Sequence, residues 1–248
     1  MTYCAAILLD AGLVMASDSR TNAGVDQISS YRKTTVFEKP GDRVIVLLNS
    51  GNLAVTQGVV NMLSSQARHT EGPPNLLTVE SMTEAAALVG AALREVHQRD
   101  GPYLTQHNID ARASFIVAGQ IRGERPRLFL VYTEGNYIEA TEDTPYFQIG
   151  ETKYGKPIID RVVTPQTPLI EAAKCLLVSF DSTMRSNISV GLPIDLLIYE
   201  RDTLRVGLSR RITEADPYYQ MVHTQWASGL RQVFAQLPNP DWSYTQPT

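Results

Sequence analysis

The chain has 248 residues, a hydrophobic fraction of 43%, a charged fraction of 19% and a formal net charge of -4. These values are typical of a soluble globular protein. The charges are spread along the chain, which argues against nucleic acid as a partner because phosphate binding needs clustered basic residues. Apolar runs such as 44–48 and 129–132 are too short to span a bilayer.

The first apolar run, residues 5–9, ends at Asp10 and lacks a basic start, so we expect no signal peptide. Only two cysteines, Cys4 and Cys175, are present. No disulfide framework is implied, and we expect a cytoplasmic protein. A Cys4 nucleophile is one interpretation of the sequence, but we prefer to interpret both cysteines as small buried apolar residues.

The chain begins with segments that resemble strands. Residues 2–9 and 13–17 are apolar runs around a turn, and residues 31–38 and 43–49 follow with a second turn between them. The spacing of apolar residues then changes. Apolar side chains recur at three- and four-residue steps, which predicts helices at residues 53–63 and 81–100. Ser81 and Glu84 make a capping box for the second helix.

Strands return at 113–120, 127–133 and 136–141, followed by helices at 155–163 and 169–184, strands at 194–201 and 204–211, and a last helix at 217–237. Paired helices between runs of strands argue against a doubly wound parallel sheet. We therefore expect an α+β fold, a four-layer αββα sandwich of two antiparallel sheets between helical layers. The chain is interpreted as a single domain, 1–248, with a C-terminal helix and tail at about 217–248.

The start of the chain carries the most informative residue. Thr2 follows the initiator Met1, and a residue this small in second place is a good substrate for removal of Met1. A threonine hydroxyl needs a nearby base to act as a nucleophile, and its own freed α-amine, with a pKa near 7.7–8.0, can be that base. We expect Thr2 to be the nucleophile, although many chains carry an inert threonine at this place.

Two charged residues favour the catalytic interpretation. If the first two strands form a hairpin, Asp18 returns beside Thr2, although an acid at a strand end is more often a turn former. Lys33 would then pair with Asp18, and its charge would favour the alkoxide and lower the pKa of the amine. Without Asp18, an exposed strand lysine would be the simpler interpretation of Lys33.

Gly51 lies between a predicted strand and a predicted helix, in Ser50-Gly51-Asn52. Its backbone N–H is well suited to stabilise an oxyanion at a helix N-terminus. The four histidines have no metal-ligand spacing and are interpreted as structural or surface residues, so we expect no cofactor and no catalytic metal.

The order of these motifs resembles a proteasome β-type subunit, an N-terminal-nucleophile (Ntn) hydrolase. Thr2 is followed by Ala16-Ser17-Asp18-Ser19-Arg20, by Lys33, and by Ser50-Gly51 before a helix. The resemblance implies that Thr2 is the nucleophile, Asp18 the first acid, Lys33 the essential lysine and Gly51 the oxyanion glycine. It also implies a supporting acid and serine in the segment 180–187, for which Asp181 and Ser186 are the candidates.

Within this superfamily, the opening five residues and the segments 150–157 and 181–191 are most similar to the bacterial ancestral-β-subunit branch, called Anbu. The resemblance covers nearly the whole chain. Two departures stand out. Glu151 replaces the serine that usually follows the glycine matched by Gly150, and no propeptide precedes Thr2, so activation would depend on removing Met1 alone.

The resemblance implies a threonine protease, or a hydrolase of related amide bonds, inside a self-compartmentalising homo-oligomer that forms a ring or an open spiral. Its substrate would be a peptide or amide, with no nucleic acid and no membrane as partners, and an unfoldase partner stays an open question. Two alternatives remain: a self-assembling scaffold with little or no chemistry, and a small-substrate amidase.

The tail aromatics Trp242 and Tyr244 predict docking on a neighbouring subunit.

Overall fold

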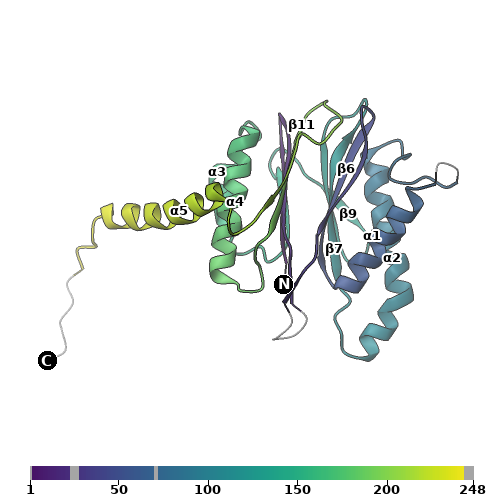
Figure 1. The fold of residues 1–248 in the computed structure, drawn as a ribbon, viewed down its shortest axis with the longest axis horizontal. Coiled ribbons are helices and arrows are strands. Elements are labelled where there is room, and N and C mark those ends of the chain that lie inside the picture. Colours follow the sequence, from purple (N-terminus) through teal and green to yellow (C-terminus); the bar gives the residue numbers. More distant parts are fainter. Residues whose placement is uncertain (1, 23–27, 70–71, 243–248) are drawn as a thin grey trace.

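A computed structural model describes residues 2–22, 28–69 and 72–242 of the chain. Met1 and Tyr244, which the sequence analysis singled out, lie outside these residues. Two antiparallel five-stranded sheets stand face to face, with helices on both outer sides (Figure 1).

The first sheet contains both strands of the N-terminal hairpin. Its order is β10 (Tyr146–Gly150), β1 (Tyr3–Leu9), β2 (Gly12–Asp18), β11 (Ile194–Glu200) and β12 (Leu208–Ile212). The second sheet has the order β5 (Thr34–Lys39), β6 (Arg43–Gly51), β7 (Ala113–Ile121), β8 (Arg127–Val131) and β9 (Tyr137–Glu139). A separate pair, β3 (Arg20–Asn22) and β4 (Ile28–Ser30), extends past the end of β2.

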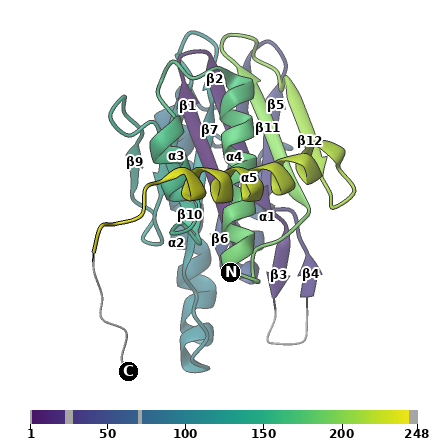
Figure 2. The same ribbon diagram turned by 90° about the vertical axis from the view of Figure 1, so that its left-hand side faces the viewer.

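The helices form two outer layers and one projecting arm. Helices α1 (Leu53–Gln66) and α2 (Met82–Gln106) cover the second sheet, and α3 (Lys156–Val162) and α4 (Leu169–Ser186) cover the first. Helix α5 (Pro217–Gln236) crosses the outside of α4 and continues away from both sheets (Figures 1 and 2). Within the described part of the chain, no helix is long and apolar enough to cross a membrane.

The core explains why β1 is apolar at nearly every position. Side chains of a strand alternate between its two faces. Tyr3 and Ala5 pack toward α3 and α4, whereas Cys4 and Ala6 pack between the two sheets. Both faces of the strand are therefore buried, and an alternating polar pattern cannot occur.

The predicted fold is confirmed, since two antiparallel sheets lie between helical layers. Strand β10, which pairs with β1, and the short pair β3 and β4 were not predicted from the sequence pattern. Helix α2 also continues six residues past the predicted end at Asp100, through Pro102 to Gln106. Leu104 packs against the hydrophobic core between α2 and the second sheet. This contact stabilises the last turn, although Pro102 has no backbone N–H to donate within the helix.

Candidate active site

The first peptide of the described chain is held on both sides. Asp18 lies opposite Tyr3 in the register of β1 and β2, and Asp18 Oδ1 accepts a hydrogen bond from Tyr3 N–H at 2.9 Å. On the other side, Glu151 N–H donates to Thr2 O at 2.7 Å. A side chain on Gly150, whose φ is +85°, would place its Cβ 1.9 Å from Thr2 O, so this close approach requires glycine. Thr2 is thus fixed between β2 and the end of β10.

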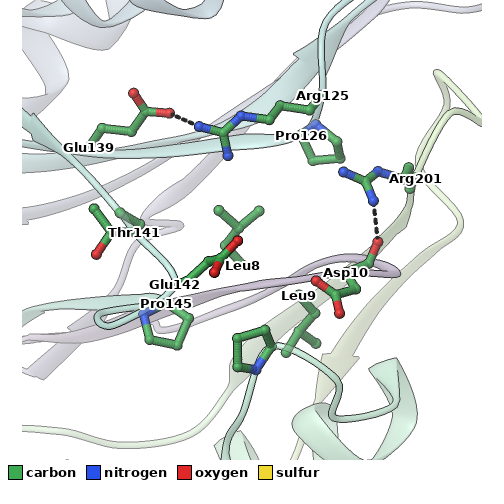
Figure 3. Close-up of a pocket in the computed structure, with 12 residues that line it drawn as sticks. Leu8, Leu9, Asp10, Arg125, Pro126, Glu139, Thr141, Glu142, Pro145 and Arg201 are labelled. Atoms are coloured by element: carbon green, nitrogen blue, oxygen red, sulfur yellow. Dashed lines mark hydrogen bonds and ion pairs between the residues drawn. The ribbon is translucent and has the colours of Figure 1, made fainter.

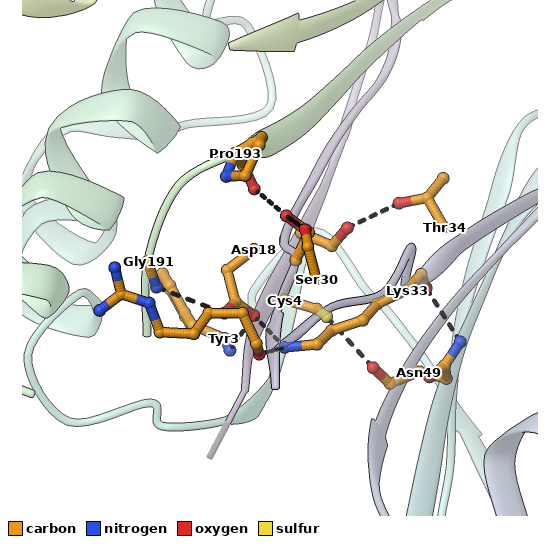
Figure 4. Close-up of polar contacts among 12 residues, drawn as sticks. Tyr3, Cys4, Asp18, Ser30, Lys33, Thr34, Asn49, Gly191 and Pro193 are labelled. Atoms are coloured by element: carbon orange, nitrogen blue, oxygen red, sulfur yellow. Dashed lines mark hydrogen bonds and ion pairs between the residues drawn. The ribbon is translucent and has the colours of Figure 1, made fainter. Parts of the chain in front are cut away.

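Lys33 and Asp18 form a buried ion pair (Figure 4), and Asp18 accepts from the N–H of the peptide that joins Thr2 to Tyr3. Lys33 Nζ is 2.6 Å from Asp18 Oδ1 and also donates to Arg20 O at 2.6 Å. Asp18 is fully buried, and Lys33 is 4% exposed. The backbone of Lys33 is fixed in turn, because its carbonyl accepts from both N–H and Nδ2 of Asn49 on β6. The cation that the sequence predicted is therefore present and rigidly held.

The pKa values of two buried groups follow from this environment. Burial raises the pKa of the Asp18 carboxyl, and the Lys33 ammonium and the N–H groups of Tyr3 and Gly191 act in the opposite direction. Burial also raises the pKa of the Cys4 thiol far above its usual range. A thiol that stays protonated is a poor nucleophile. The structure confirms that both Cys4 and Cys175 are buried, as we expected.

Gly51 is the last residue of β6, two residues after Asn49, whose N–H binds Lys33 O. Asn52 N–H donates across to Arg112 O at 2.9 Å, while Asn49 N–H donates to Lys33 O at 3.0 Å on the opposite side. Backbone N–H groups of a strand alternate between its two neighbours, so Gly51 N–H is directed to the Lys33 side, like that of Asn49. Gly51 has a φ of +115°, and a Cβ there would lie 2.2 Å from Arg112 O, so only glycine fits.

The structure does not bring Asp181 and Ser186 to this group. Asp181, on α4, points outward to α5, where Tyr219 Oη donates to its Oδ1 at 3.3 Å and His223 Nδ1 lies 2.6 Å from the same oxygen. Ser186 is the exposed last residue of α4. The sheet-facing positions of α4 are different ones, such as Ser179, whose Oγ is 2.6 Å from Tyr3 Oη.

The loop after α4 supplies the contacts instead. Gly191 N–H donates to Asp18 Oδ2 at 3.4 Å (Figure 4), and Asn187 Nδ2 donates to Glu151 Oε2 at 2.9 Å. These contacts come from the segment 181–191 that the sequence singled out, but from Asn187 and Gly191 rather than from Asp181 and Ser186. The available signal was Asn187 directly after the helix, because its side-chain amide carries two N–H donors that can bind a neighbouring acceptor.

A separate cavity of about 460 Å³ lies at the opposite end of β1 (Figure 3). Its walls include Leu8, Asp10, Arg125 and Arg201. There Arg125 pairs with Glu139 at 3.0 Å. Asp10 is at the β1–β2 turn, whereas Thr2 precedes the first residue of β1. The cavity and Thr2 are thus at opposite ends of β1. The cavity is not part of the candidate active site around Thr2, Asp18 and Lys33.

Two antiparallel sheets between helical layers, with a threonine just before the first strand and a buried lysine–aspartate pair beside it, define a protein with the proteasome β-like fold. No family model and no curated protein matches the chain. The solved structures identify the branch, and the chain belongs to the Anbu (ancestral β-subunit) family.

Three of these structures show the extent of the similarity. Anbu from Yersinia bercovieri is 51% identical with a TM-score of 0.92, and the match covers 98% of this chain and 100% of that one. Anbu from Hyphomicrobium sp. strain MC1 is 49% identical with a TM-score of 0.88, covering 97% and 100%. A structure from Pseudomonas aeruginosa, described as a helical assembly of the Anbu complex, is 49% identical with a TM-score of 0.93, covering 98% and 100%.

Proposed function

We propose that the chain is an N-terminal-threonine hydrolase of peptide or related amide bonds, active once Met1 is removed. The observation that carries this proposal is the buried Lys33–Asp18 pair beside Thr2. A buried ion pair is weak evidence for stability alone, because desolvation offsets much of the attraction. Perturbed charged groups of this kind cluster at functional sites.

The lysine is suited to activate the Thr2 hydroxyl. An ammonium has three N–H donors. Among the hydrogen bonds of the described residues, Lys33 Nζ uses two, to Asp18 Oδ1 and to Arg20 O. We assign the third to Thr2 Oγ1, where the positive charge favours the alkoxide during attack.

In this mechanism, Thr2 Oγ1 attacks the substrate carbonyl carbon while its proton passes to the Thr2 α-amine. The tetrahedral oxyanion accepts a hydrogen bond from Gly51 N–H. The C–N bond then breaks, the leaving amine takes the proton, and Thr2 carries an ester. Water hydrolyses that ester with the same amine as base, which returns the free hydroxyl. Asp18 acts by holding Lys33, and Asp181 and Ser186 have no part in this scheme.

We also propose that the enzyme works inside a homo-oligomer, a ring or an open spiral. Large apolar side chains are exposed along the outer half of α5 and just beyond it, namely Leu230, Val233, Phe234, Leu237 and Trp242. An apolar row on a projecting helix favours contact with another protein surface. The similar P. aeruginosa protein forms a helical assembly, which supports a second copy as the partner.

The test begins with the chain terminus. Intact mass and N-terminal sequencing of the purified protein should show Thr2 as the first residue, and a peptide boronate or vinyl sulfone should then form an adduct on Thr2. A free Thr2 that forms no adduct and cleaves nothing would favour the scaffold alternative. Turnover of small amides without turnover of peptides would favour the amidase alternative.

A further inference from the structure

Glu151 carries a buried carboxylate that has no positively charged partner among the described residues. The residue is 6% exposed. Its oxygens accept from Asn187 Nδ2 at 2.9 Å and from Lys153 N–H at 3.4 Å, and both donors are uncharged amides. None of the ion pairs of the described residues includes Glu151. A buried carboxylate is costly without a cation, so this position is suited to receive one.

The neighbour across from Glu151 is Thr2. The register of β1 and β10 pairs Tyr3 with Gly150, and the hydrogen bond from Glu151 N–H to Thr2 O continues that register by one residue. Removal of Met1 would create an α-ammonium on Thr2, the residue whose carbonyl accepts from Glu151 N–H. The other nearby carboxylate, Asp18, is already paired with Lys33 at 2.6 Å.

We propose that Glu151 is a positioning residue whose carboxylate is the counter-ion of the Thr2 α-ammonium. This inference rests on the proposed function, because the cation exists only after Met1 is removed. Asn187 holds the carboxylate in place, and Glu151 N–H holds the carbonyl of the same residue that carries the amine. Glu151 therefore orients the base without touching the substrate.

Four other charged residues surround this place. Asp18 on β2 accepts from Tyr3 N–H and is paired with Lys33, which directly precedes β5. The Arg20 guanidinium packs on Gly191, where a Cβ would meet it at 2.3 Å, and it donates to Ile188 O at 2.7 Å. Lys153 has an exposed side chain. As a counter-ion Glu151 would raise the pKa of the amine, whereas the Lys33 charge would lower it.

Glu151 could instead act only as an anchor for the loop after α4, through Asn187. The two roles differ in charge. Glu151→Gln keeps an oxygen that can accept from Asn187 Nδ2 but loses the negative charge. Asn187→Ala keeps the charge but loses the anchor. A counter-ion predicts that only the first variant lowers the pKa of the amine by about one pH unit, since an opposite charge at this range shifts a pKa by one or more.

The experiment measures that pKa directly. Each protein is produced as a fusion that is cleaved to begin at Thr2. Trace acetylation by acetic anhydride is followed across pH, and the N-terminal peptide is quantified by mass spectrometry. Glu151→Gln should give an amine pKa about one pH unit below wild type. Glu151→Asp and Asn187→Ala keep the negative charge but change its placement, so the pKa should fall by clearly less than in Glu151→Gln. The control Glu171→Gln, an exposed acid of α4, should also leave the pKa unchanged.

An unchanged pKa in Glu151→Gln would overturn the inference, and so would an equal fall in Asn187→Ala. The acetylation reports on the amine and not on turnover. A protein that hydrolyses nothing but shows the shift would reject the proposed hydrolase and leave the role of Glu151 standing. A protein that hydrolyses peptides but shows no shift in Glu151→Gln would support the proposed hydrolase and reject the role of Glu151.

Discussion

Replacing Lys33 by methionine tests the site most directly, because methionine has a similar volume and no charge. The substitution leaves Asp18 fully buried without its partner. Breaking a buried pair in this way costs about 3–5 kcal/mol of the free energy of unfolding. For a chain of 248 residues, this corresponds to a fall in Tm of about 6–20 °C at constant protomer concentration. Loss of one preorganised charge should also lower kcat by about 10²–10³.

The stability loss should depend on pH in a defined direction. Burial raises the pKa of the Asp18 carboxyl in the folded protein, and removal of Lys33 raises it further. Below the unfolded pKa of about 3.9, both states are protonated and the penalty vanishes. Above it, the penalty grows by about 1.4 kcal/mol per pH unit until the folded pKa is reached. The Tm difference from wild type should therefore be small at pH 4.5 and large at pH 7.5.

Two further variants complete this test. Asp18→Asn combined with Lys33→Met should recover much of the lost Tm at pH 7.5 but none of the activity. Lys39→Met, at an exposed lysine 3.7 Å from Asp42, should change neither. Fluorogenic peptide hydrolysis and thermal unfolding provide the readouts. The reasoning is refuted if Lys33→Met keeps more than a tenth of the wild-type kcat, or if its Tm loss is the same at both pH values.

The other predictions concern the nucleophile, the acid limb, the loop and the tail. Thr2→Ala should abolish hydrolysis and leave the assembled mass unchanged in light scattering; activity above background would exclude Thr2 as the nucleophile. The apparent pKa of the acid limb of the pH–rate profile should lie above that of an ordinary aspartate, because Asp18 must stay ionised to hold Lys33 and burial raises its pKa. An apparent pKa at or below the ordinary value would contradict this. Gly191→Ala places its Cβ 2.3 Å from the guanidinium end of the flexible Arg20 side chain, which can move aside, so kcat should stay within about twofold of wild type, as for Gly229→Ala with nothing within 4 Å; a tenfold loss would show that the loop cannot adjust. Truncation after Leu237 should reduce the assembled mass at equal protein concentration, and an unchanged mass would remove the tail as an assembly element.

Local chain geometry made part of the site predictable from the sequence. A two-strand hairpin fixes which residues meet, so the spacing from Thr2 to Asp18 was enough to place the acid beside the start of the chain. Gly51 could also be found locally, because a glycine between a strand and a helix indicates a backbone conformation that other residues rarely adopt. Lys33 was predicted through its charge complementarity to Asp18.

The positions of α4 and its loop could not be derived in this way. Successive helix residues differ by about 100° in direction, so a change of one or two positions turns a side chain from the sheet to the outer face. Asp181 lies on the outer face of α4, where α5 contacts it, and the packing of these two helices is not encoded in a local sequence pattern. The role of Glu151 depends on β10 joining β1, which the sequence analysis did not predict.

The double attachment of the first peptide has an entropic consequence. The ends of a folded chain usually fray, because few contacts oppose their conformational freedom. Here the carbonyl of Thr2 is bound by Glu151 N–H, and the N–H of Tyr3 is bound by Asp18. The ring of Tyr3 is buried against Phe180 at 4.4 Å between centroids. Folding itself therefore removes conformational freedom from Thr2, and the proposed hydrolysis would not have to order this residue.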